Sequence, residues 1–257
     1  MPALADRLAF ATELAHSAGA MALRLRPAPG AAHGTLKGRQ DWLTEADGAV
    51  ERYLSERLAA RFPDDGFQGE EAGRTREGNL RWVVDPIDGT SNFARGGTRW
   101  CVSVGLMEAG IPLLGVLSAP ARQELYAAAR GGGAALNGAV IRVAETASMD
   151  RAMIEAGWSA RVDSADYLAL CGRIVGAGAM LRSGGSGALG LVEVAAGRLD
   201  GYVELHINLW DCAAALAVLA EAGAMTNAYR EEGGPILAAA PGVGLALAEL
   251  AGMALQS

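Results

Sequence analysis

One segment in the first half of the chain, residues 82–93 (WVVDPIDGTSNF), constrains the fold more than any other. Its apolar start predicts a buried strand that ends near Asp85, and Pro86 stiffens a turn between Asp85 and Asp88. Hard cations such as Mg²⁺ prefer oxygen ligands in a tight octahedral shell, so the two carboxylates can share a pair of ions. Residues 89–91 then offer unpaired backbone N–H groups at a predicted helix start, which is a site for phosphate.

The composition limits the classes of partner. The chain has 257 residues, of which 51% are hydrophobic, and this is enough for one large domain or two smaller ones. The net charge is −7 and no basic stripe is present, so nucleic acid and membranes are not expected as partners. An acidic protein that acts on an anionic substrate needs local positive charge, and bound metal is the simplest source.

Cysteine and histidine usage indicates a reduced, cytoplasmic protein without a zinc site. The three cysteines form no C-x-x-C pair, and the three histidines are scattered. The first residues lack the basic and apolar regions of a signal peptide.

Lys37 is the only lysine, ten residues before Asp47. It is a possible active-site residue, and drift in a GC-rich genome is the alternative explanation.

Hydrophobic periodicity predicts two different halves. In the first half, helices at 3–26 and 44–61 precede strands at 66–69, 80–85, 101–107, 113–117 and 124–128, with a charged loop at 71–79. In the second half, strands at 152–156, 178–182, 201–205 and near 224 and 236 alternate with helices at 164–176, 186–197, 211–222 and from 242. We therefore expect an α+β domain over residues 1–144, with most metal ligands, and an α/β domain over residues 145–257, with the substrate contacts.

Three further carboxylates stand at the starts or ends of predicted elements. Glu70 follows a strand, Asp211 opens an apolar helix, and Asp47 lies in the first turn of a helix whose N-cap is Thr44. Helix capping, worth under about 1 kcal/mol, is an alternative for Asp47 and Asp211, and a solvated loop charge is the alternative for Glu70. Together with Asp85 and Asp88, the set indicates metal-dependent phosphate chemistry.

Four blocks resemble the inositol monophosphatase family of Mg²⁺-dependent, lithium-sensitive phosphatases. They are DWLTEAD at 41–47, GEE at 69–71, DPIDGTSNF at 85–93, and WDCAA at 210–214 continued by EAG at 221–223. The resemblance covers nearly the whole chain. It implies a layered α-β-α-β-α sandwich, of the type shared with fructose-1,6-bisphosphatase, and a homodimer.

The resemblance also implies roles for individual residues. The Mg²⁺ ligands would be Glu70, Asp85, the Ile87 carbonyl, Asp88 and Asp211. Glu70 and the pair Asp47–Thr90 would orient and deprotonate the attacking water. The substrate contacts would be Asp88, Gly89, Thr90, Gly185, Ser186, Gly187, Glu204 and Asp211. Glu204 would accept hydrogen bonds from ring hydroxyls, with a surface carboxylate as the alternative, and His206 is either a substrate-mouth residue or a polar loop residue.

Three functions remain open. The first is a phosphomonoesterase that hydrolyses myo-inositol monophosphate, or a related polyol or sugar phosphate, by direct attack of water. The second is a histidinol-phosphate phosphatase, which has the same motifs. The third, of another class, is a regulatory binding protein of the transcription machinery with a secondary phosphatase activity. The intact carboxylate set favours catalysis.

Overall fold

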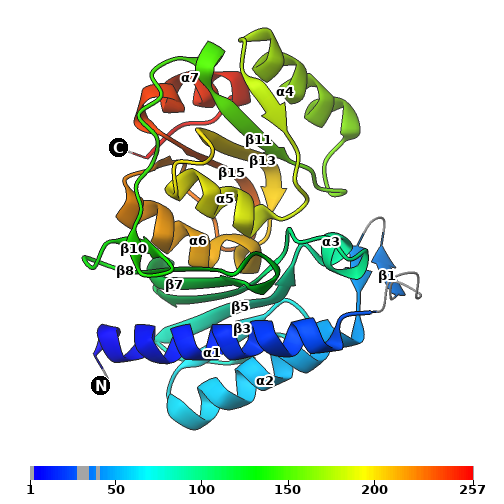
Figure 1. Cartoon of the computed structure of the whole chain (residues 1–257), viewed down its shortest axis with the longest axis vertical. Coiled ribbons are helices and arrows are strands. Elements are labelled where there is room, and N and C mark those ends of the chain that lie inside the picture. The colour runs from blue at the N-terminus through cyan, green and yellow to red at the C-terminus, as the bar shows by residue number, and fades with distance from the viewer. Residues whose placement is uncertain (1–2, 28–34, 39–40, 257) are drawn as a thin grey trace.

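The protein is a sandwich of five layers in which helices and sheets alternate (Figure 1). The computed structural model describes residues 3–27, 35–38 and 41–256, with the backbone alone at 35–38 and 41–43. The outer and middle layers are three pairs of helices: α1 (Leu4–Leu25) with α2 (Glu45–Arg61), α5 (Gly187–Ala195) with α6 (Leu209–Ala222), and α4 (Ser164–Gly176) with α7 (Pro241–Ala251). The α-β-α-β-α prediction is therefore confirmed.

The first sheet has eight strands in the order β10-β9-β8-β7-β6-β5-β3-β4, and every pair except β3–β5 is antiparallel. The strands are β3 (Gly66–Gly69), β4 (Gly73–Arg76), β5 (Leu80–Asp88), β6 (Cys101–Glu108), β7 (Ile111–Ala119), β8 (Glu124–Ala129), β9 (Ala134–Leu136) and β10 (Ala139–Val140). The prediction of a loop at 71–79 is wrong, because β4 lies within this range. The strand β4 is at the exposed edge of the sheet, where charged residues are tolerated on both faces and obscure the usual alternation of apolar and polar residues.

The second sheet has five strands in the order β12-β11-β13-β15-β14, with β11 parallel to both β12 and β13. The strands are β11 (Met153–Gly157), β12 (Met180–Arg182), β13 (Gly201–Ile207), β14 (Met225–Thr226) and β15 (Gly234–Ala239). A hairpin of β1 (Thr35–Gly38) and β2 (Asp41–Leu43), a short helix α3 (Thr90–Ala94) and the 3₁₀ turns η1 (Pro120–Arg122) and η2 (Met149–Arg151) complete the described elements.

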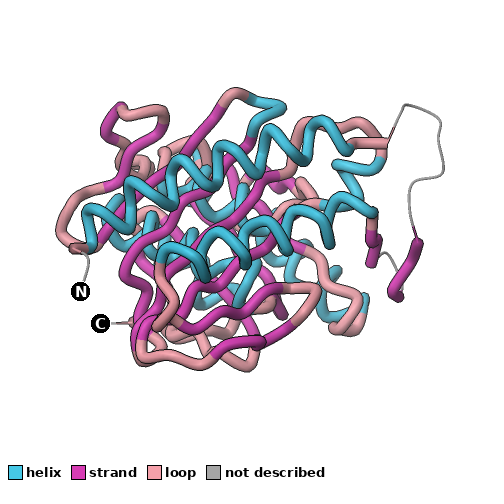
Figure 2. Tube along the Cα trace, turned by 90° about the horizontal axis from the view of Figure 1, so that it is seen from below, coloured by secondary structure: helices cyan, strands magenta, loops and turns pink. Residues whose placement is uncertain are grey.

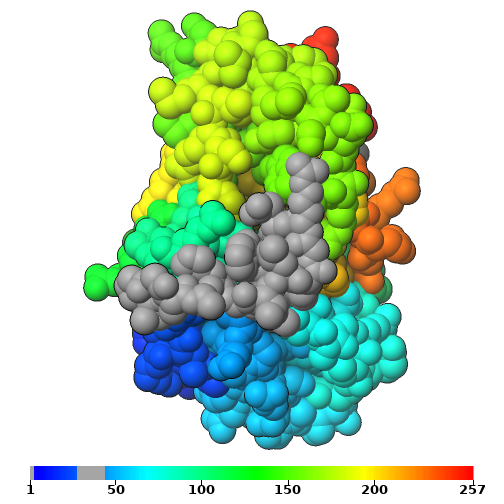
Figure 3. Space-filling model, turned by 90° about the vertical axis from the view of Figure 1, so that its right-hand side faces the viewer, coloured from blue at the N-terminus to red at the C-terminus, as the bar shows by residue number. Residues whose placement is uncertain are grey.

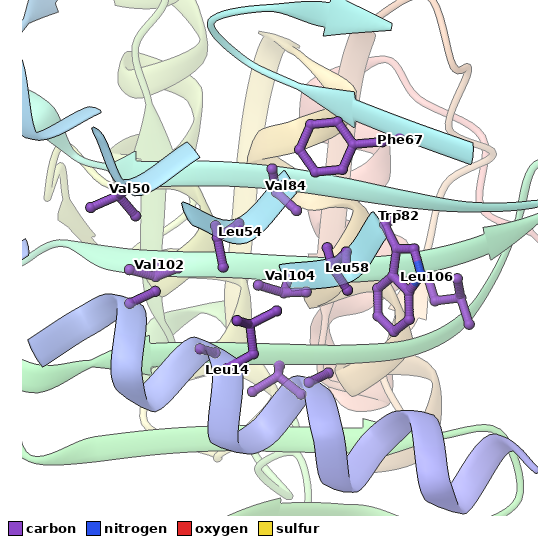
Figure 4. Close-up of a cluster of buried hydrophobic side chains, with 14 of the residues drawn as sticks. Leu14, Val50, Leu54, Leu58, Phe67, Trp82, Val84, Val102, Val104 and Leu106 are labelled. Carbon is purple, nitrogen blue, oxygen red and sulfur yellow. The ribbon is translucent and has the colours of Figure 1, made fainter. Parts of the chain in front are cut away.

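Helices α1 and α2 lie side by side across the outer face of the first sheet (Figure 2). Helix α2 packs on β5, and α1 packs on β6, β7 and β8. The core between these layers contains fully buried side chains, among them Leu54 and Leu58 of α2 with Trp82 and Val104 of the sheet (Figure 4). At the start of α2, the predicted cap is present, with Thr44 and Asp47 forming a reciprocal capping box. This core fixes the strand that carries Asp85 and Asp88.

Helix α6 packs on the inner face of the same sheet at very short range. A Cβ atom added to Gly115 of β7 would overlap the backbone of Ala214, and one on Gly105 of β6 would lie 2.9 Å from the Ala214 nitrogen. This contact joins the two halves of the chain, which form the lower and upper parts of the molecule in Figure 3. The division at residue 144 stays a prediction. None of the described helices is both long and apolar enough to cross a bilayer.

Candidate active site

A cavity of about 600 Å³ lies where segments from both halves of the chain meet. Its walls come from the end of β5 and the start of α3, from the loop after β11, from the start of α5 and from the end of β13 together with the start of α6. This region contains most of the residues that the sequence singled out.

The end of β5 brings two aspartates to one place by a β-bulge. Asp85 pairs with Ser103 of β6 and Asp88 with Cys101, so the register shifts between them. In a regular strand, residues three positions apart point to opposite faces, and one extra residue in a bulge restores the same face. The Ile87 amide donates to Oδ1 of Asp85 at 2.8 Å, which fixes the bulge. The strand therefore continues to Asp88, and the prediction that it ends near Asp85 is wrong.

Asp211 approaches the same point from the second half. One carboxylate oxygen each from Asp85, Asp88 and Asp211 lies within 4.8 Å of the other two. Asp211 occupies the third position of α6, and its Oδ2 accepts from the backbone amide of Asn208 at 3.0 Å and from the Asn208 side chain at 3.1 Å. The capping interpretation and the cluster interpretation therefore both hold for this residue.

Burial raises the pKa values of all three carboxyl groups and is the largest cause in each case. Repulsion by neighbouring carboxylates adds to it at Asp85 and Asp88, whereas hydrogen bonds from Asn208 partly offset it at Asp211. The charges of Glu70, Asp88 and Asp211 add to it at Asp85, and the charge of Asp211 adds to it at Asp88, whose pKa rises to about 7. A set of close, buried carboxylate oxygens is the donor set of a hard divalent cation, which offsets the repulsion. The residues present therefore fit Mg²⁺.

The repulsion predicts a pH dependence that metal abolishes. A group whose pKa is raised by folding stabilises the folded state while it is protonated, and this contribution is lost as the pH rises through the folded value. In EDTA, the melting temperature is therefore expected to fall as the pH rises from about 4, the ordinary pKa of an aspartate, to about 7, the pKa of Asp88, and to level off above it. Excess Mg²⁺ should remove the decline. Thermal unfolding between about pH 4 and 8 measures both effects, and a profile in EDTA that is flat below about pH 7 would contradict the cluster.

Glu70 and Ile87 lie near this cluster, but neither belongs to the set of three close carboxylates. Glu70 lines the cavity and its charge raises the pKa of Asp85, but its oxygens are not among those within 4.8 Å. The Ile87 carbonyl accepts from the Thr90 hydroxyl at 2.8 Å. Both remain predicted ligands.

Asp47 and Thr90 are brought together as predicted from the resemblance. The two oxygens of the fully buried Asp47 have different partners: Oδ2 accepts from the Thr44 amide and hydroxyl at 2.8 and 2.6 Å, and Oδ1 faces the Thr90 hydroxyl at 3.3 Å. Capping thus uses one oxygen and leaves the other directed at Thr90. Burial raises the pKa of Asp47.

Gly89 precedes α3 in the left-handed region, at φ +87°. A Cβ atom there would lie 2.8 Å from the Arg99 carbonyl oxygen and 3.1 Å from Cβ of Ser186, so glycine alone suits both the conformation and the space. Gly89 and Thr90 line the cavity, as do Gly185, Ser186 and Gly187.

Ser186 contacts a predicted metal ligand directly. Its hydroxyl donates to Oδ2 of Asp88, and the Ala188 amide donates to the same oxygen at 3.1 Å. Ser186 is also the N-cap of α5. In this structure, its side chain orients Asp88, so its predicted contact with substrate would be made by other atoms of the residue.

Glu204 is buried at the cavity wall, which excludes the surface-carboxylate alternative. It accepts from the Tyr202 hydroxyl at 2.5 Å, and burial raises its pKa to about 8. His206 also lines the cavity, with its Nδ1 atom buried and without a hydrogen-bond partner among the described residues. Lys37 lies in β1, and its side chain is outside the described residues.

Comparison with known proteins decides the family. The profile of the inositol monophosphatase family matches residues 3–255. The chain belongs to the inositol monophosphatase family. It is 39% identical over 213 residues to a protein of Xylella fastidiosa named Nus factor SuhB, covering 81% of this chain and 77% of that protein. It is 41% identical over 199 residues to an inositol-1-monophosphatase of Synechocystis, covering 75% and 69%.

Solved structures agree on the fold. The extragenic suppressor protein suhB of Bartonella henselae superposes with a TM-score of 0.89 at 29% identity, over 96% of this chain and 98% of that one. The chain is thus similar both to proteins named as phosphatases and to proteins named as Nus factors, within one family.

The loop after β11 contributes residues that sequence reasoning missed. Trp158 and Arg161 line the cavity, and Arg161 is the single arginine or lysine among its described lining residues. Its positive charge lowers the pKa of Asp211. No motif marks the loop. The loop could have been expected at the site from its position after β11, which is parallel to both of its neighbours, because ligands bind at the carboxyl ends of such strands.

Proposed function

We propose that this chain is a Mg²⁺-dependent phosphomonoesterase that hydrolyses myo-inositol monophosphate or a related polyol or sugar phosphate. The observation that carries the proposal is the cluster of Asp85, Asp88 and Asp211, whose oxygens lie within 4.8 Å of one another, with Asp88 and Asp211 on the wall of a cavity. Similarity to the inositol-1-monophosphatases of Synechocystis and Rhizobium meliloti supports the substrate class. A cavity of about 600 Å³ admits a ring-sized polyol phosphate.

Asp85, Asp88 and Asp211, with Glu70 and the Ile87 carbonyl, would hold Mg²⁺. When bound, the metal supplies Lewis-acid polarisation of the ester and a lower pKa of its water. The chain's own groups do the remaining work. Glu70 and the pair Asp47–Thr90 would orient the attacking water and take up its proton. In the pair, the Thr90 hydroxyl would accept the proton from water and pass its own proton to Oδ1 of Asp47.

Other groups would bind the substrate. Gly89 and Thr90 line the cavity, and their backbone N–H groups would donate to the phosphate. Glu204, which also lines the cavity, would accept hydrogen bonds from hydroxyls of the alcohol. Arg161 would attract the anionic substrate toward an otherwise acidic cavity. Direct attack by water requires no phosphorylated side chain, and no serine or cysteine is assigned as a nucleophile.

A substrate panel tests the proposal. With Mg²⁺, the purified protein is expected to release phosphate from myo-inositol monophosphate faster than from histidinol phosphate, a sugar phosphate or a nucleotide 3′-phosphate, and EDTA should abolish release. Preference for histidinol phosphate would change the proposed substrate but leave the proposed metal-dependent hydrolysis of a phosphomonoester unchanged. If Mg²⁺ binds by calorimetry and no panel member is hydrolysed, the enzyme assignment is wrong.

A regulatory function is the second candidate, since the relatives from Xylella fastidiosa and Escherichia coli are named Nus factors. Such a protein would bind the transcription machinery whether or not its carboxylate cluster is intact. Co-purification of RNA polymerase with both the wild type and Asp88→Asn would support it. Homodimer formation and lithium inhibition stay predictions of the family resemblance.

A further inference from the structure

The loop between β12 and α5 determines how Asp88 is held. Ser186 at its end donates to Oδ2 of Asp88, and the Ala188 amide donates to the same oxygen. A displaced loop would remove both donors. The contacts that fix residues 184–186 therefore influence the position of Asp88, although these contacts do not themselves involve the carboxylate cluster.

The side chain of Asn92 binds this loop from the side of α3. Its Nδ2 atom lies 2.9 Å from the Arg99 carbonyl oxygen, 2.9 Å from that of Gly184 and 3.2 Å from that of Gly185. Three surrounding carbonyl oxygens require a donor at this position, so the amide nitrogen faces them. The Asn92 backbone amide in turn donates to the Gly89 carbonyl at 2.9 Å, which ties Asn92 to the first turn of α3.

The two segments that Asn92 joins are in backbone contact. A Cβ atom on Gly89 would lie 3.2 Å from the Gly185 carbonyl oxygen and 3.1 Å from Cβ of Ser186. Gly185 itself has φ +73°, in the left-handed region, so its carbonyl direction depends on a conformation that glycine adopts readily. The segment 88–90 and the loop 184–186 therefore form one unit only while this close contact is maintained.

A carboxylate fixes the loop from the other side. The Gly184 amide donates to Oε1 of Glu155 at 3.2 Å. Glu155 is buried and accepts from Arg99 at 2.5 Å and from Arg182 at 2.9 Å. Gly184 is thus bonded through its carbonyl to Asn92 and through its amide to Glu155, and the loop has little freedom to move in either direction.

We infer that Asn92 is a positioning residue, whose side-chain amide holds the loop 184–186 against the segment 88–90 so that Ser186 keeps Asp88 directed at Asp85 and Asp211. The inference rests on the proposed function, and it adds a residue that acts on the cluster through two others. Aspartate at position 92 has nearly the same shape but cannot donate, and its negative oxygens would face three carbonyl oxygens. The loop would then separate from α3.

The test compares Asn92→Asp with a matched control, Asn137→Asp. Asn137 also donates to a carbonyl, that of Gln123 at 2.9 Å, and it lies between β9 and β10, at the β10 edge of the first sheet and outside the cavity lining. Calorimetry of metal-free protein with Mg²⁺, together with kcat and KM, gives the readout. For Asn92→Asp we expect the Kd for Mg²⁺ to rise about tenfold and kcat to fall at least tenfold. For Asn137→Asp both should stay within twofold, with a lower melting temperature only.

Two results would overturn the inference. A folded Asn92→Asp whose Kd and kcat stay within twofold of the wild type shows that the bridge is not needed, and equal losses in Asn137→Asp show that general loosening is the cause. If Asn92→Asp does not fold, Asn92→Ala, which removes the donors without adding charge, is measured against the same limits. A wild type that neither binds Mg²⁺ nor hydrolyses the substrate panel refutes the proposed function instead.

Discussion

Asp88→Asn is expected to lower kcat/KM by about 10³-fold, or roughly 4 kcal/mol of transition-state stabilisation. The substitution removes one negative charge from three carboxylates whose oxygens lie within 4.8 Å. Folding should survive, because asparagine has the same shape and its oxygen can still accept from Ser186 and Ala188. In EDTA above about pH 7, the variant should melt at a higher temperature than the wild type, since it no longer buries a charge at position 88 or repels Asp211.

Asp200→Asn is the control for Asp88→Asn. Asp200 is also a buried aspartate, but its Oδ2 accepts from the Met153 amide at 2.7 Å, at the start of β11 and away from the cavity. Its replacement should leave kcat/KM and the effect of Mg²⁺ on the melting temperature unchanged. Activity of Asp88→Asn near the wild-type level would show that the metal assignment is wrong.

Gly115→Ala is expected to be the most destabilising glycine-to-alanine change among the glycines whose surroundings the structure describes. The new Cβ atom would overlap the Ala214 backbone, which belongs to α6 and cannot rotate away as a side chain can. Overpacking of this kind costs about 1–3 kcal/mol, and more when backbone must move. Chemical denaturation measures the free energy of unfolding, and activity should fall as well, because α6 carries Asp211.

Gly172→Ala is the matched control. Gly172 lies in α4, and a Cβ atom there meets nothing within 4 Å. Alanine is favoured over glycine in a helix by about 1 kcal/mol, so this variant should be more stable than the wild type. If the two variants have the same free energy of unfolding, the close contact between β7 and α6 does not limit the sequence at position 115.

The fold was predictable where the hydrophobic pattern is periodic and long. The helices and the strands β5 to β8 follow from it directly, with errors of a few residues. The pattern failed at β4, which is short, charged and exposed, and at β9 and β10, which have three and two residues. Pairing with a neighbouring strand, and not local sequence, stabilises such short elements.

The candidate site was predictable only in part for a related reason. Asp85 and Asp88 are close in sequence, but their common orientation depends on a bulge set by pairing with β6. Asp47 and Asp211 read equally well as helix caps, and each in fact uses one oxygen for that purpose. Asn92 lies within the block 85–93, but its partners, like the surroundings of Arg161, are on segments that only the folded chain brings near, so the sequence did not indicate what either residue contacts.

The glycine contact beneath α6 has a consequence for ion selectivity. The thickness of the packed layer between β7 and α6 sets how far Asp211 stands from Asp85 and Asp88, because α6 rests on glycine with no side chain between. Mg²⁺ and Ca²⁺ differ by a few tenths of an ångström in their preferred oxygen distances. We therefore expect a substitution at Gly115, in the interior of the protein, to change which of the two ions the proposed site binds more tightly.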